Sequence, residues 1–159
     1  MKSQSIETKI NIYTFDELSN EIKNLVSAAK TAVNTSYSPY SEFKVGAAVL
    51  LENGAVFSAS NQENAAYPSG LCAERVAMFY ANSQQPQTPV TAIAVAAYTK
   101  GSFLDTPISP CGACRQVLLE TEVRFGKPID IYLFGTNEIF HIRGAQQLLP
   151  FCFAKESLK

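Results

Sequence analysis

The stretch AIAVAAYTKGSFLDTPISPCGACRQVLLETEV, residues Ala92–Val123, contains a strand, a loop and a helix in succession. Ile93–Tyr98 is an apolar run of strand length, and the loop after it carries glycine and proline. From Cys111 to about Val123 the sequence predicts a helix, which is entered directly from Pro110. A strand that is followed by a helix of this length implies a crossover connection, and therefore a sheet that is at least partly parallel.

The rest of the chain contains similar short elements. Apolar residues recur at steps of three and four from Thr14 to Asn34, which predicts an amphipathic helix with Thr14 as its N-cap. Glu52-Asn53-Gly54 is a hairpin signal, and Pro68-Ser69-Gly70 is a candidate cap for a second helix. The remaining predicted elements are helices over Leu71–Asn82 and Gly144–Leu149 and strands over Phe43–Leu51, Ala55–Ser60, Ile129–Phe134 and Ile139–Ile142. This order predicts an α/β fold, a three-layer α/β/α sandwich whose mixed sheet of about five strands has helices on both faces.

Length and charge limit the class of protein. A chain of 159 residues fits one domain, so we expect residues 1–159 to form a single domain in which about residues 1–13 are an N-terminal extension. Thirteen basic and fourteen acidic residues give a net charge of −1. This balance argues against polymeric nucleic acid and anionic membranes as partners, because both require a basic surface.

The apolar segments indicate where the protein works. The longest of them, Val45–Leu51 and Ala92–Ala97, fall well below the roughly 18 residues that would suggest a transmembrane helix. The N-terminal residues lack the apolar core of a secretory signal. We therefore expect a cytoplasmic location, in which the four cysteines are metal ligands or catalytic groups rather than a disulfide framework.

Three cysteines at the starts of two predicted helices are the most informative pattern. Cys111 and Cys114 are three positions apart in a first helical turn and point the same way, and Cys72 is the obvious third ligand for a metal ion. A structural zinc site is usually closed by four protein ligands, whereas three ligands leave the open position of catalytic zinc. Cys152 lies in the apolar segment LLPFCF, and we expect it to be a small buried hydrophobic residue.

Glu74 follows Cys72 by two positions on the second predicted helix. At that spacing its side chain cannot fully share the direction of the cysteine, so it is better placed beside a metal-bound water than on the metal. That is the position of a general base. The one histidine, His141, is interpreted as a strand residue without a catalytic role.

Cys72-Ala73-Glu74 and Pro110-Cys111-Gly112-Ala113-Cys114 resemble the signature of the zinc-dependent cytidine deaminase superfamily. Their first cysteines are 39 positions apart (111 − 72 = 39). Further segments, from about Thr35 to Phe153, narrow the resemblance to the small cytidine deaminases that form homotetramers. These segments are Ser38-Pro39-Tyr40-Ser41, Phe43, Val45-Gly46-Ala47, Asn61, Glu63-Asn64-Ala65, Tyr67-Pro68, the run PCGACRQ and Leu148-Leu149-Pro150.

The resemblance implies an activity and a metal. The activity is hydrolytic deamination of cytidine and 2′-deoxycytidine to uridine and 2′-deoxyuridine in pyrimidine salvage, with one zinc ion per subunit held by the three cysteines. Glu74 is implied to take a proton from the zinc-bound water and to deliver it to N3 of the pyrimidine. Arg75 is implied to donate to the cysteine ligands, and Arg115 is expected to add positive charge beside them.

The resemblance also assigns the substrate pocket. Asn61 and Glu63 alternate at the end of a strand, so their side chains share a face, and they are implied to hydrogen-bond the ribose, above all its 3′-hydroxyl. Gln62 is expected to face the other way. Phe43 is implied to pack against the base. Three further residues are implied to reach the active site of an adjacent subunit in a shared, homotetrameric arrangement: Ala65, Tyr67 and Phe153.

The residues by themselves leave other functions open. Cys111 and Cys114 form a CxxC pair that could work as a disulfide oxidoreductase without zinc. A structural zinc ion in a binding module would need no Glu74. A deaminase of another aminopyrimidine, such as blasticidin S, would keep the cysteine motifs without a ribose-binding pair. Editing of RNA or DNA is disfavoured because the charge balance lacks a basic face.

Overall fold

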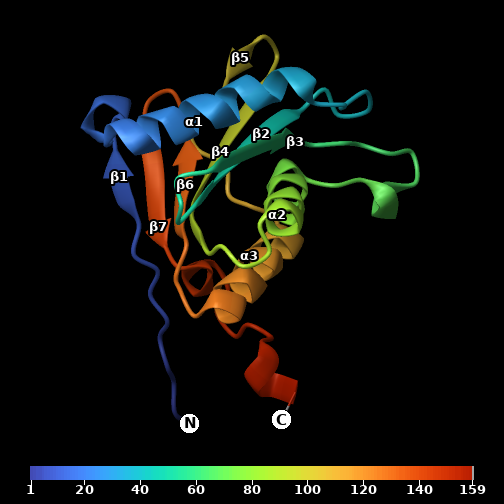
Figure 1. The fold of residues 1–159 in the computed structure, drawn as a ribbon. Coiled ribbons are helices and arrows are strands. Elements are labelled where there is room, and N and C mark those ends of the chain that lie inside the picture. The colour runs from blue at the N-terminus through green and yellow to red at the C-terminus, as the bar shows by residue number, and fades with distance from the viewer. Residues whose placement is uncertain (159) are drawn as a thin grey trace.

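Helix α1 (Asn20–Ala32) lies on one face of a mixed sheet, and helices α2 (Ala73–Gln84) and α3 (Gly112–Phe125) lie on the other, in the computed structural model, which describes residues 1–158 (Figure 1). The sheet order is β1-β7-β6-β4-β2-β3, with β5 paired to β4. The strands are β1 (Asn11–Tyr13), β2 (Lys44–Leu51), β3 (Val56–Ser60), β4 (Val90–Thr99), β5 (Ser102–Phe103), β6 (Asp130–Phe134) and β7 (Ile139–Arg143). The predicted three-layer sandwich is confirmed.

One pair of strands explains the position of α3. Strands β4 and β6 are parallel, whereas every other pairing between the named strands of the described chain is antiparallel. Parallel neighbours need a crossover connection, and α3 lies within the chain segment that joins them. The crossover that Ala92–Val123 predicts is therefore present, and it places the start of α3 beside one end of the sheet.

The sheet has seven strands rather than the expected five. All five predicted strands are present, and the two additional ones are β1, which pairs with β7, and β5, which pairs with β4. They are three and two residues long, which is too short for alternation of apolar and polar residues to be recognised in the sequence. Strand β1 also brings residues 11–13 of the expected N-terminal extension into the sheet.

The helix boundaries differ from prediction at the N-terminal side. Thr14 caps a 3₁₀ turn over Phe15–Glu17, with Glu17 completing a capping box, and Leu18 then adopts an extended conformation. Helix α1 starts afresh, with the Ser19 hydroxyl accepting from the Ile22 N–H. The prediction that Thr14 caps α1 is therefore wrong, because Thr14 and its capping box belong to the separate 3₁₀ turn before the helix.

Two other predicted helix boundaries also change. Residues Tyr67–Ser69 form a separate 3₁₀ turn, and Cys72, not the Pro68–Gly70 segment, is the N-cap of α2. The predicted helix over 144–149 is a 3₁₀ turn at Ala145–Leu148. Within residues 1–158 no helix has both the length and the apolar character that a membrane span requires.

Both faces of the sheet are covered, which explains why its central strands are apolar without alternation. On β2, Ala47, Val49 and Leu51 pack in the core beneath α2 and α3. The intervening residues Ala48 and Leu50 pack in the second core beneath α1. The run VGAAVLL therefore contributes side chains to both cores. The site residues belong to the layer that contains α2 and α3.

Helix α1 approaches the sheet at Gly46. A Cβ atom at this position would lie 2.0 Å from the Ala29 carbonyl oxygen and 2.8 Å from the Val33 amide nitrogen. Both are backbone atoms, so no side-chain rotation could relieve the overlap. Glycine is required here because α1 crosses β2 in direct backbone contact.

Helix α3 is held at its other end by a half-buried carboxylate. Glu122 Oε1 accepts from the Ile129 N–H at 2.7 Å and the Ala145 N–H at 2.8 Å, and burial raises the pKa of the Glu122 carboxyl. The bonds join α3 to the segment that enters β6 and to the 3₁₀ turn after β7. This fixes the direction along which α3 presents its first turn.

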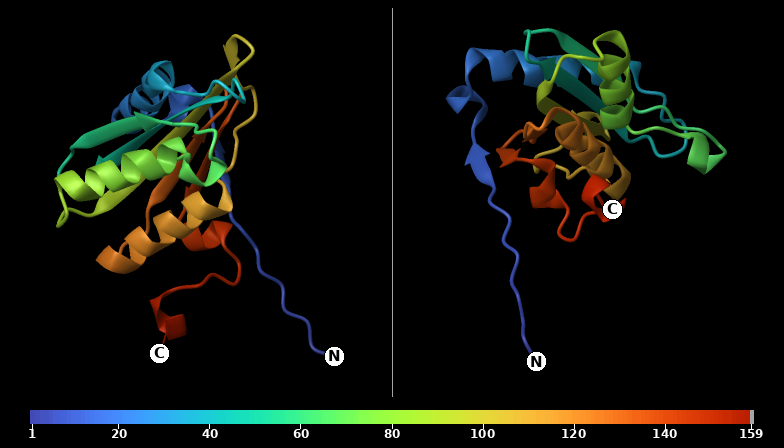
Figure 2. Two further views of the ribbon diagram at one scale, coloured as in Figure 1. Left: turned by 90° about the vertical axis from the view of Figure 1, so that its right-hand side faces the viewer. Right: turned by 60° about the horizontal axis from the view of Figure 1, so that its bottom comes forward.

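Both termini leave the sandwich at the same end (Figure 2).

We expect Gly46→Ala to lower the free energy of unfolding by at least about 2 kcal/mol, since overpacking a close backbone contact costs roughly 1–3 kcal/mol or more. Urea unfolding followed by circular dichroism measures this loss. Gly112→Ala is the matched control, because a Cβ there meets no atom within 4 Å. An equal stability of the two variants would contradict the close contact between α1 and β2.

Candidate metal centre and active site

Three cysteine thiols meet where α2 and α3 begin. Cys72 is the N-cap of α2 and Cys111 the N-cap of α3, and Cys114 follows one turn later. The Sγ atoms of Cys72 and Cys111 are 3.7 Å apart and those of Cys111 and Cys114 are 3.5 Å apart. All three lie within 4.8 Å of one another. The sequence prediction that these cysteines converge is confirmed.

The spacing of the sulfurs fits a tetrahedral metal ion. With zinc–sulfur bonds of about 2.3 Å, two ligands of a tetrahedron are separated by about 3.8 Å, which is close to the separations found here. Within the described residues this is the single group of histidine, cysteine and acidic ligands that could hold a metal. Cys152 is not in it and packs against the main core instead, so the donor set is three thiolates with room for a fourth ligand.

The surroundings of the cluster favour the ionised form of Cys72. Each helix N-terminus directs partial positive charge at the site, and Arg75 Nη2 donates to Cys72 Sγ at 3.8 Å. The pKa of Cys72 is lowered to about 5, first because the Cys114 thiol hydrogen-bonds to it and then because Arg75 is adjacent. The same hydrogen bond, together with burial, raises the pKa of Cys114. The ionised form is thus favoured at Cys72, with the Cys114 thiol as its hydrogen-bond donor.

Glu74 lies beside the sulfurs in the first turn of α2. Its side chain is 6 % exposed, and it is one of four buried polar or charged residues in the described chain. Burial raises the pKa of the Glu74 carboxyl, and the charge of Cys72 raises it further. A raised pKa favours the protonated form of the carboxyl group, which suits a residue that both accepts and donates protons.

A cavity of about 480 Å³ opens next to Cys72 and Arg75. Asn61 and Glu63, in the segment after β3, also line this cavity. Gln62 is also among the lining residues, and its side-chain amide donates to the Thr35 carbonyl and the Ser60 hydroxyl, neither of which belongs to the cavity wall. The segment continues into a projecting loop that returns to α2 (Figure 1).

Asn61 is fixed by three hydrogen bonds to its own chain. Its Oδ1 accepts from the Ser36 hydroxyl at 2.5 Å and from the Val45 N–H at 2.8 Å. Its Nδ2 donates to the Phe43 carbonyl at 2.9 Å. An asparagine amide has two acceptor positions and two donor hydrogens, so one N–H is left over.

Glu63 is fixed in a similar way by the segment Ser38-Pro39-Tyr40-Ser41, to which the resemblance assigned no role. One carboxylate oxygen accepts from the Ser41 hydroxyl, and the other accepts from the Tyr40 N–H at 3.0 Å and the Ser41 N–H at 3.3 Å. The Ser41 hydroxyl, followed by these backbone donors, lowers the pKa of Glu63. The carboxylate is therefore ionised and remains an acceptor. The Ser- and Pro-rich segment 36–41 was the signal that could have indicated these roles.

Other predicted site residues do not reach this cavity within one chain. Phe43 contributes its carbonyl to Asn61, and its ring is not part of the cavity wall. Arg115 donates to the Pro110 and Leu148 carbonyls and to the Ser109 hydroxyl, each at 2.8 Å. It therefore orients the segment before Cys111, and its described hydrogen bonds do not include the sulfurs.

The three residues expected to serve an adjacent subunit occupy exposed positions. Tyr67 lines the cavity and is 82 % exposed on the projecting loop, and Ala65 is exposed on the same loop. Phe153 is 60 % exposed and lines a different groove, on α3. Within one chain, Phe153 therefore has no contact with the cavity beside Cys72.

A family model described as the cytidine and deoxycytidylate deaminase zinc-binding region matches residues 19–125. The chain is similar to cytidine deaminase from Sporosarcina psychrophila, with 39 % identity over 87 % of this chain and 95 % of that protein. It is also similar to cytidine deaminase from Halalkalibacterium halodurans, with 40 % identity over 84 % and 95 %. The matched region contains all three clustered cysteines and Glu74.

Solved structures give the same result. The fold resembles that of cytidine deaminase from Burkholderia pseudomallei, with a TM-score of 0.69 and 41 % identity over 82 % of this chain and 97 % of that one. It also resembles cytidine deaminase from Mycobacterium tuberculosis, with a TM-score of 0.65 and 32 % identity over 84 % and 97 %. The similarity spans the sheet, the helices and the cysteine cluster together. The donor set and the family model agree that this cluster is a zinc site.

We expect Cys72→Ser, Cys111→Ser and Cys114→Ser each to weaken zinc binding more than about a hundredfold, because loss of even an outer-shell partner costs 10–100-fold. Elemental analysis of the purified proteins, with a chromophoric chelator titration, measures the change. Cys152→Ser is the matched control and should keep the zinc content of the unaltered protein. Loss of zinc from the Cys152 variant alone would place the metal elsewhere.

Proposed function

Because the chain belongs to the cytidine and deoxycytidylate deaminase family, we propose that it hydrolyses cytidine and 2′-deoxycytidine to uridine and 2′-deoxyuridine, with release of ammonia, in pyrimidine salvage. One observation carries the proposal. Cys72, one of the three converging thiols, lines a cavity together with Asn61 and Glu63, and the buried Glu74 follows Cys72 by two residues. This supports an arrangement in which metal ligands, a proton carrier and hydroxyl-binding groups act on one bound molecule.

The thiols would hold the metal. Zinc bound by Cys72, Cys111 and Cys114 supplies a Lewis acid that lowers the pKa of water to about 7, so that the nucleophile is available at neutral pH. Positive charge from the chain itself reduces the electron density that the three thiolates donate to the metal. Arg75 donates to Cys72 Sγ, and the N-termini of α2 and α3 direct partial positive charge at the sulfurs.

Glu74 would move the protons of the reaction. Hydrolysis at C4 of the base requires a proton at N3 and then a second proton on the departing amine. Burial raises the pKa of the Glu74 carboxyl, which makes it a better proton acceptor than an exposed glutamate. Its place in the first turn of α2, two residues after Cys72, keeps it beside the metal ligands.

Asn61 and Glu63 would recognise the sugar. Asn61 has one N–H free to donate, and the Glu63 carboxylate is an acceptor. A ribose hydroxyl both accepts and donates, so it can satisfy the two groups together, and the 3′-hydroxyl is the one we propose. A site of this kind discriminates against analogues that lack the hydroxyl, because its polar groups are then left without partners. The pair favours a nucleoside over another aminopyrimidine.

The active site is proposed to be shared in a homotetramer. Tyr67 on the projecting loop and Phe153 near the C-terminus are exposed within one chain and are proposed to enter the cavities of adjacent subunits. The proposal includes a location in the reducing cytoplasm, where the thiols stay available for zinc. It also keeps Phe43 as a contact of the base.

We expect Glu74→Gln to retain zinc and to lower kcat for cytidine about 10²–10⁴-fold, the usual contribution of a positioned acid-base group. The fall of cytidine absorbance in the ultraviolet measures turnover, and elemental analysis measures the metal. Full activity of this variant would overturn the role of Glu74. An inactive but zinc-loaded unaltered protein would overturn cytidine as the substrate.

We expect Glu63→Ala to lower kcat/KM for cytidine by about 10–100-fold, since a hydrogen bond to a charged group contributes about 1.5–3 kcal/mol. Ser41→Ala should lower it less, by about threefold to tenfold, because the carboxylate keeps its two backbone donors. The positioning role predicts that turnover of 3′-deoxycytidine changes little in both variants. The control is Ser27→Ala, an exposed serine on α1. Equal losses for cytidine and 3′-deoxycytidine would contradict sugar recognition.

A further inference from the structure

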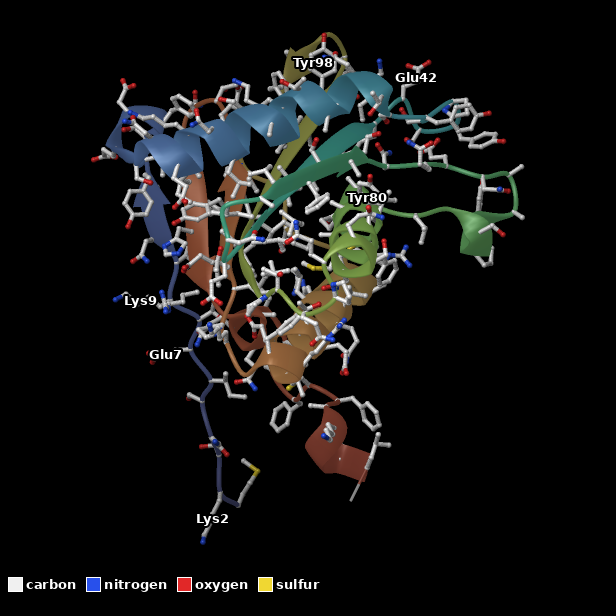
Figure 3. The ribbon with its side chains drawn as sticks, in the orientation of Figure 1. Lys2, Glu7, Lys9, Glu42, Tyr80 and Tyr98 are labelled. Carbon is white, nitrogen blue, oxygen red and sulfur yellow. The ribbon has the colours of Figure 1, made fainter. Side chains whose placement is uncertain are left out.

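A second cavity, of about 380 Å³, is lined by residues of the C-terminal end of α1, the start of β2, and β4 and β5. Its walls carry Lys30 and Lys44 together with the rings of Tyr98 and Phe103. Figure 3 shows Tyr98 at the end of the sheet beside β5. Lys44 and Tyr98 are partners in the β2–β4 register and lie on the α1 face. The sheet therefore separates this cavity from the cysteine cluster.

Lys30 is held at the cavity by aromatic rings. Its Nζ lies 4.5 Å from the centroid of Phe134 and 5.1 Å from that of Phe103, and the residue is half-buried. Ring faces attract a cation through their quadrupole but carry no net charge. The ammonium group is thus positioned and partly removed from water without being neutralised.

Neither lysine of the cavity has a carboxylate partner in the described chain. The ion pairs within residues 1–158 involve Lys127, His141 and Arg143. The C-terminal end of α1 contributes about half a negative charge, which two full positive charges exceed. Glu42 is at the same end of the molecule, and its carboxylate is turned outward in Figure 3. The local positive charge contrasts with a net charge of −1 for the chain.

We propose that this cavity is an anion site that binds the phosphate group of a small ligand. Two ammonium groups can neutralise a phosphate, and Asn34 on the cavity wall adds a neutral donor. The volume falls in the range of small-ligand sites. The group can come from inorganic phosphate or from a nucleotide, whose base would stack on the ring of Tyr98, since Phe103 stands at 81° to that ring. The inference is independent of the proposed deaminase activity, because it concerns the opposite face of the sheet.

Isothermal titration of the full-length, zinc-loaded protein with inorganic phosphate and with adenosine 5′-monophosphate tests the proposal. We expect Lys30→Met and Lys44→Met each to weaken binding about tenfold, which matches the loss of one charge-assisted hydrogen bond. Methionine keeps the apolar stem that packs on the rings. The matched control is Lys23→Met, which removes a lysine of the same helix that also lies near a ring, Phe15, but outside the cavity.

An affinity for the nucleotide at least tenfold above that for phosphate identifies the nucleotide as the source, and equal affinities identify free phosphate. The proposal is overturned if the unaltered protein binds neither ligand at a ligand concentration of about 10 mM, because even weak specific sites are occupied at that concentration. Undiminished binding by the Lys44→Met variant also overturns the proposal. Lys44 is exposed at the start of β2, so this variant is expected to fold even if Lys30→Met does not.

Discussion

Three cysteine sulfurs packed within 4.8 Å of one another make up the arrangement on which the rest of the site depends. Thiolates at this spacing repel one another unless positive charge compensates them. Two helix N-termini and Arg75 provide part of that charge, and a divalent cation provides the rest. The arrangement holds only because α2 and α3 are packed on the same face of the sheet, so that the hydrophobic core beneath them sets the metal geometry.

The layer on the opposite face serves a different purpose. Helix α1 contacts the backbone of β2 at Gly46 and packs over small side chains such as Ala48 and Ala94. Close packing of this kind leaves little freedom for the central strands to shift. The rigid strands β2 and β4 in turn carry the residues beneath α2 and α3. The α1 layer thus fixes the sheet, while the α2 and α3 layer uses that sheet to bring together side chains far apart in the sequence.

The sequence predicted those parts of the structure that depend on local pattern. Long apolar runs and the CxxC spacing predicted five strands, the main helices and the cysteine cluster. Strands β1 and β5 were missed because pairing with a neighbour, not local pattern, makes them strands. The separate capping of α1 by Ser19 was missed because Thr14 is an equally good cap. The role of Arg115 was misjudged because its partners, Pro110 and Leu148, are brought together only by the folded chain.

The polar groups of the cavity show how a rigid site can be selective. Asn61 has three of its four hydrogen-bonding positions occupied by Ser36, Val45 and Phe43, and Glu63 is tied to the loop at Ser41. Neither side chain can turn to suit a different ligand without breaking bonds to its own chain. What remains is one donor beside one acceptor, which matches a hydroxyl group better than a group that only donates or only accepts. The proposed selectivity for a sugar thus rests on groups that the fold has already immobilised, and the cost of ordering them is met on folding rather than on binding.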